Sequence, residues 1–195
     1  MRIRLAPLRR DEQVLSALRD LLFGRDVAAL SGWNLKVSGS PRDCASEIIG
    51  QWFDCLRDFE LDAKRRPHAR SYLISCPGGF RADYLDLMWE ALMYWLSFDF
   101  PNNPALLAFF EGSGDLLTWK ILLNAASLIP CGGLGKLYRD RLQRQFEEAA
   151  AMVLGKRLGL EGLGFDRLSL ILRKPRRELE RLIGREAFSG PRGPS

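Results

Sequence analysis

The residue types that most often carry out chemistry are scarce in this sequence. There is one histidine, His68, in the basic stretch KRRPHAR. The cysteines are Cys44, Cys55, Cys76 and Cys131. Nucleophilic catalysis needs a serine or cysteine beside a base, and metal sites need ligands at characteristic spacings. The sequence has neither pattern, so we expect a protein that is not an enzyme and that has no metal site and no cofactor. Four scattered cysteines are also no disulfide framework, which favours a reducing compartment.

The segment 131–136 (CGGLGK) invites comparison with a phosphate-binding loop. That motif requires glycine at position 130 and a hydroxyl residue at position 137, where this chain has Pro130 and Leu137. The segment also follows a stretch that we expect to be helical rather than a strand. We therefore interpret it as a turn between helices.

Two groups of charged residues are candidate binding sites. Asp83, Asp86 and Glu90 are spaced i, i+3 and i+7, which places three carboxylates on one stripe of a helix. Such a stripe is either the solvent-facing side of a buried helix or a recognition strip for a basic partner.

The second group lies at the C-terminus. Residues 165–195 contain eight Arg and Lys against four Asp and Glu, a net charge of +4 in a chain whose total is +5. The candidate residues for binding nucleic acid or an acidic protein are Arg173, Lys174, Arg176, Arg177, Arg181 and Arg185. The alternative interpretation is an ordinary solvated helix surface.

Periodic apolar residues predict the helices that would position these groups. Helices are expected over 12–23, from Ser40 to Phe59, over 116–129 and over 136–158, with short helical pieces at 26–30 and 104–110. The segment 81–98 is apolar around almost its whole circumference, so we expect it to be enclosed by other helices. Short strands are possible only at 33–37 and 71–75, and residues 77–79 (PGG) are expected to form a turn.

The predicted fold class is therefore all-α, a single-domain bundle of six or seven helices around the apolar helix at about 82–98. We expect a helical core over 1–164, a basic helical hairpin over 165–188 and a flexible tail over 189–195. The first residues lack the apolar region of a signal peptide, and the longest uncharged run, 121–135, is short and interrupted. These features predict a cytoplasmic protein without membrane insertion.

Three segments resemble a known family. YLISC at 72–76 and RADYL at 81–85, with Pro67 upstream and LLF at 21–23, are similar to the SctK/OrgA accessory sorting-platform proteins of type III secretion. The resemblance implies a helical, cytosolic scaffold that bridges larger components through protein contacts. Our leading hypothesis is thus a non-enzymatic accessory subunit of a cytosolic assembly.

The segment 165–185 carries a second resemblance. Two short apolar segments separated near Pro175, the second reading RRELERLIGR, resemble the helix-turn-helix of CRP-like and AraC-like regulators. A basic second helix of this kind would neutralise phosphates while Arg176, Arg177 or Glu180 reached base edges. The alternative function is therefore a DNA-binding transcriptional regulator.

Overall fold

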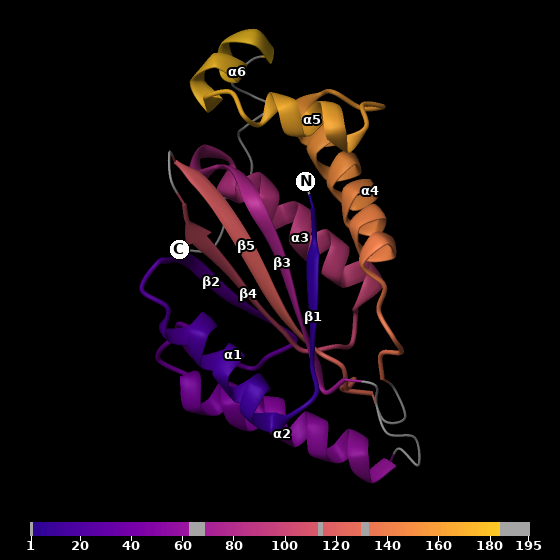
Figure 1. Ribbon diagram of the computed structural model, residues 1–195. Coiled ribbons are helices and arrows are strands. Elements are labelled where there is room, and N and C mark those ends of the chain that lie inside the picture. The colour runs from indigo at the N-terminus through magenta and orange to yellow at the C-terminus, as the bar shows by residue number, and fades with distance from the viewer. Residues whose placement is uncertain (1, 63–68, 113–114, 130–132, 184–195) are drawn as a thin grey trace.

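A central sheet divides the molecule into three layers. The computed structural model describes residues 2–62, 69–112, 115–129 and 133–183. In these residues a five-stranded antiparallel sheet lies between two layers of helices (Figure 1). The prediction of an all-α bundle with at most two short strands is therefore wrong. His68, Cys131, Arg185 and the predicted tail 189–195 lie outside the described residues.

The sheet has the spatial order β1-β3-β5-β4-β2, and each neighbouring pair is antiparallel. The strands are β1 (Arg4–Leu8), β2 (Val27–Trp33), β3 (Ser71–Arg81), β4 (Ala105–Glu111) and β5 (Leu116–Asn124). Pro7 lies in the edge strand β1, where its missing N–H costs no ladder hydrogen bond.

The two central strands explain why the fold class was mispredicted. Successive residues of β4 alternate between two hydrophobic cores: Leu107 and Phe109 pack on one face of the sheet, and Leu106 and Ala108 on the other. A strand buried on both faces reads as a continuous apolar run, which periodicity cannot distinguish from a buried helix. The helices predicted at 104–110 and 116–129 are therefore β4 and β5.

Four smaller predictions also change. Residues 27–30 of the short helical piece expected at 26–30 belong to β2, and the strand expected at 33–37 is wrong beyond Trp33, where β2 ends. The strand expected at 71–75 is real but continues to Arg81. Residues 77–79, predicted to be a turn, form an irregularity inside β3 where the pairing with β5 shifts register.

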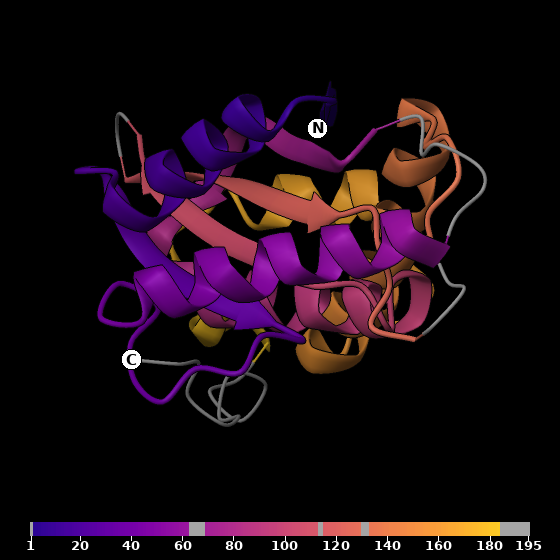
Figure 2. The ribbon, with the colours of Figure 1, turned by 90° about the horizontal axis from the view of Figure 1, so that it is seen from below.

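The amphipathic helices were predicted correctly. They are α1 (Asp11–Phe23), α2 (Ala45–Asp62), α3 (Leu85–Asp99), α4 (Arg139–Leu158), α5 (Phe165–Ile171) and α6 (Arg176–Ile183), and a 3-10 turn (η1, Ala82–Tyr84) precedes α3. The helices α1 and α2 cover one face of the sheet, and they lie in front of the strands in the view from below (Figure 2). The helices α3 and α4 cover the other face.

The apolar segment predicted as a buried helix over 81–98 is one from Leu85 onward, after the end of β3 and η1, but its neighbours differ from the expectation. Its inner side packs on the sheet, and α4 lies alongside it. Trp95 is fully buried there, with its ring centroid 5.5 Å from those of Phe100 and Phe146 and 6.5 Å from that of Trp119. This aromatic cluster joins α3, α4 and β5 into one core.

The chain turns back on itself after α4. Gly159 ends α4 in the left-handed conformation (φ +65°), and its N–H caps the final carbonyls of the helix. The following helices α5 and α6 lie at the N-terminal end of α3 (Figure 1). Phe165, Leu168 and Leu179 are buried in the same core as α3 and α4, so α5 and α6 are packed against the rest of the fold.

Candidate docking surface on α3 and α4

The outward side of α3 carries one stripe of residues with two kinds of chemistry. Asp83, Asp86, Glu90, Tyr94 and Phe98 follow one another at intervals of three or four residues, so they share one side of the helix and of η1. The stripe is acidic in its first half and aromatic in its second half. We call these the acidic half and the aromatic half.

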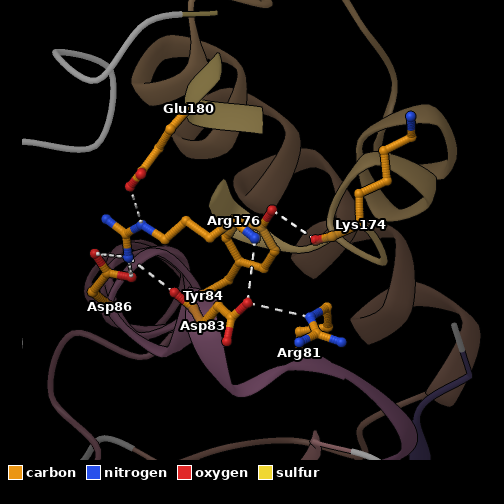
Figure 3. A network of polar contacts seen from close by, with 7 residues as sticks. All are labelled: Arg81, Asp83, Tyr84, Asp86, Lys174, Arg176 and Glu180. Atoms are coloured by element: carbon orange, nitrogen blue, oxygen red, sulfur yellow. Dashed lines mark hydrogen bonds and ion pairs between the residues drawn. The ribbon is translucent and has the colours of Figure 1, made fainter. Parts of the chain in front are cut away.

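The acidic half is covered by α6. The guanidinium Nη1 of Arg176 lies 3.0 and 3.1 Å from the two carboxylate oxygens of Asp86 and donates to the backbone oxygen of Asp83 at 2.9 Å (Figure 3). The backbone N–H of Arg176 donates to Asp83 Oδ2 at 3.2 Å. Nε of the same arginine reaches Glu180 at 3.3 Å. Arg176 thus joins both aspartates to its own helix.

The remaining carboxylate contacts also come from the same chain. Arg157 Nε of α4 lies 3.2 Å from Glu90 Oε2, and Arg81 Nε lies 3.2 Å from Asp83 Oδ2. All three acids singled out in the sequence are therefore in ion pairs with arginines of this protein. Their use by a basic partner remains a prediction, and such a partner would have to compete with these arginines.

The protonation states of Asp83 and Tyr84 favour these contacts between α3 and the C-terminal helices. Burial raises the pKa of Asp83, but hydrogen bonds from Arg176 and Arg81 outweigh it, so the pKa lies below its ordinary value. Burial and the charge of Asp83 raise the pKa of Tyr84 to about 12. Its phenol therefore stays protonated and donates to the backbone oxygen of Lys174 at 2.9 Å, which adds a second tie to the C-terminal helices (Figure 3).

The basic residues grouped by the sequence divide into two sets. Arg176 is turned inward to the acidic half, whereas Arg173, Arg177 and Arg181 are exposed. Lys174 is exposed too, with Nζ 3.0 Å from Glu178 Oε1. Binding of nucleic acid or an acidic protein by the exposed arginines remains a prediction.

The aromatic half is open. Phe98 is 77% exposed, Tyr94 38% and Met152 of α4 52%. The Tyr94 hydroxyl donates to Met152 Sδ at 3.8 Å, so the three side chains form one apolar patch across the two helices. Beneath it lies a cavity of about 230 Å³, lined by Tyr94, Trp95, Phe98, Asp99, Gln145, Glu148, Ala149 and Met152. We call this patch and its cavity the groove.

Carboxylates border the groove. Asp99 accepts a hydrogen bond from Gln145 Nε2 at 3.0 Å, and burial raises the pKa of Asp99 by more than the neighbouring Trp95 and Arg141 lower it. Glu148 is exposed on α4. A second cavity of about 240 Å³ shares Asp99 and Gln145, is also lined by the cations Lys136 and Arg141, and extends to the exposed ring of Tyr138. The groove therefore combines apolar surface with negative charge.

Sequence reasoning missed the groove, although a signal for it was present. Tyr94 and Phe98 continue the spacing of the acids with two steps of four residues, which marks them as the same outward side. Because α3 is apolar almost all round, the whole second half was assigned to the core. The acids show where the outward side lies, and extending that line along α3 would have identified both aromatic residues.

Two of the cysteines, Cys55 and Cys76, are buried. Burial raises the pKa of the Cys55 thiol to about 11 and that of Cys76 to about 12, so neither forms a thiolate readily. Across the part of the chain that the structure describes, no group of three or more His, Cys, Asp or Glu side chains is arranged to hold a metal ion. Lys136, the lysine of the loop-like motif, has its Nζ 5.3 Å from the centre of the Tyr138 ring.

None of the described helices combines the length and the apolarity that crossing a membrane would require. Comparisons with protein-family models, with curated proteins and with solved structures found no match to this chain.

Proposed function

We propose that this chain is a non-enzymatic protein-interaction component that binds a protein partner through the groove between α3 and α4. One observation carries the proposal. Three large apolar side chains, Tyr94, Phe98 and Met152, are exposed together over a cavity. Contiguous apolar patches on a protein surface are typical of interaction sites, and aromatic residues and methionine are enriched in them.

The narrower proposal, an accessory subunit in a type III secretion sorting platform, rests on the sequence resemblance. The helical fold that this resemblance implies is not the fold of this chain, because a five-stranded sheet forms its centre. The interaction role itself does not depend on that family.

Photo-cross-linking tests the proposed function. A benzophenone amino acid at position 98 is compared in cells with the same group at position 23. Phe23 is the matched control because it is also an exposed phenylalanine (59%) near a helix end, but on α1, in the opposite layer. We expect one defined protein adduct at position 98 and none at 23, and we expect the adduct partner to be lost from purifications of Phe98→Asp but not Phe23→Asp. Equal behaviour of the two positions would refute the proposal.

Nucleic-acid binding is the second candidate function, and one observation favours it. Arg173, Arg177 and Arg181 are spaced by four residues and are all exposed. A gel-shift series across salt tests this function, because phosphate contacts make affinity fall steeply with salt. Arg177→Ala and Arg181→Ala should both weaken the shift, whereas a protein that shows no shift at low salt would not be a DNA-binding regulator.

A further inference from the structure

We propose that the groove binds a second copy of this chain, with α6 of one molecule occupying the groove of the next. This inference rests on the proposed function and names the partner. It is argued from the chemistry of α6, from that of the groove and from their positions at opposite ends of α3.

The outer side of α6 presents one apolar residue, two arginines and one glutamate. Leu182 is 64% exposed, and Arg177, Arg181 and Glu178 are exposed as well, with Glu178 paired to Lys174. The inner side is already used, since Leu179 is buried and Arg176 binds Asp86. Within the described residues, α6 thus leaves a leucine and two arginines available to another molecule.

The groove has the complementary chemistry. Tyr94, Phe98 and Met152 provide apolar surface for a leucine side chain, and the charged residues lining this cavity are the acids Asp99 and Glu148. A carboxylate in partly apolar surroundings is stabilised by a neighbouring cation. An arginine of α6 would therefore pair with these acids while Leu182 covered the aromatic rings.

The chain already contains one contact of this type. On the acidic half, α6 meets α3 through an arginine on carboxylates and a buried leucine three residues later, Arg176 and Leu179. The outer side of α6 offers the same two side-chain types, and the groove offers carboxylates and apolar surface on the same helix face. The proposed contact repeats this pairing between molecules.

The positions exclude a contact within one molecule. Asp86, which binds Arg176, and Phe98 are twelve residues apart on α3, which corresponds to about 18 Å along the axis. Because Arg176 holds α6 at the first end, the outer side of α6 cannot reach the groove at the other end. The contact joins two different surfaces, so each molecule can bind one neighbour at each end, and chains or rings result.

Sedimentation velocity over a concentration series tests the inference with the full chain. The interface is small, so we expect weak association that raises the weight-average sedimentation coefficient only at high concentration.

Phe98→Asp places a carboxylate beside Asp99 and Glu148, and Leu182→Asp removes the apolar contact. Each should weaken association about tenfold or more. Both residues are exposed, so the variants should fold, and circular dichroism verifies this. Phe23→Asp is the control and should associate like the unaltered protein.

Mixing the two variants identifies the pairing. The Phe98→Asp molecule keeps an intact α6 and the Leu182→Asp molecule keeps an intact groove, so an equimolar mixture should regain association and stop at heterodimers. The inference is overturned if the unaltered protein stays monomeric, if the mixture does not regain association, or if Phe23→Asp weakens it equally. A monomeric protein that still cross-links a foreign partner at position 98 would refute this inference and leave the proposed function intact.

Discussion

The two halves of the outward side of α3 differ in what the rest of the chain supplies to them. Arg157 and Arg176 cover the acidic half, and their ion pairs satisfy Asp86 and Glu90. In the aromatic half Phe98 remains 77% exposed, whereas Tyr94, at 38%, is partly covered. Charge alone is therefore a poor guide to which surface is available, because here the charged residues are used internally and the apolar residues meet solvent.

The largest effect on stability should come from the buried aromatic cluster beneath α3. Trp95 points inward, is fully buried and packs against Phe100 and Phe146. Removing a buried aromatic side chain leaves a cavity, so Trp95→Ala should lower the free energy of unfolding by about 3–5 kcal/mol. Urea denaturation measures this. A loss below about 1 kcal/mol would show that the cluster does not support α3 as described.

The next largest effect on stability should come from the ion pairs of the acidic half. Arg176→Ala removes the group that joins Asp83, Asp86 and Glu180, and charged hydrogen bonds of this kind contribute about 2 kcal/mol to stability. Amide hydrogen exchange should accelerate in α6 and much less in α1. The control is Arg177→Ala, an exposed neighbour that should change stability by less than about 0.5 kcal/mol. Equal effects of the two variants would contradict the assigned role of Arg176.

Acidification should change the stability contributions of Asp83, in the acidic half, and of Asp99, beside the groove, in opposite directions. The pKa of Asp83 is lowered from 3.8 in the folded protein, so its contribution to stability is present above pH 3.8 and is lost as the pH falls through the folded pKa. The pKa of Asp99 is raised, so protonation of Asp99 favours the folded state, and that contribution is lost as the pH rises through its folded pKa. Carboxyl NMR titration should place Asp99 above 3.8 and Asp83 below it. The reverse order would contradict the described surroundings.

The smallest effect on stability should come from the aromatic half. Phe98 makes little buried contact, so Phe98→Ala should change the free energy of unfolding by less than about 0.5 kcal/mol. The same change should weaken the proposed partner contacts, which the sedimentation series measures. A substantial loss of stability, measured by the urea titration used for Trp95→Ala, would show that Phe98 belongs to the core.

The sequence predicted those parts of the fold in which one side of an element faces water. The helices α1, α2 and α4 follow from their apolar periodicity, although α2 begins at Ala45 and not at the predicted cap Ser40. The strands β4 and β5 could not be recognised in the same way because both of their faces are buried. The acids were placed correctly on one stripe, but Asp86 and Arg176 are 90 residues apart, and no local spacing reveals such a pair.

The length of α4 determines where the C-terminal helices α5 and α6 lie along α3. Its twenty residues span about 30 Å antiparallel to α3 before Gly159 reverses the chain. Adding or deleting a single turn, about 5 Å, would carry Arg176 beyond or short of Asp86 while leaving every side chain of α6 unchanged. Insertions in α4 should thus be tolerated far less well than insertions in an exposed loop, even though the helix borders solvent along most of its length.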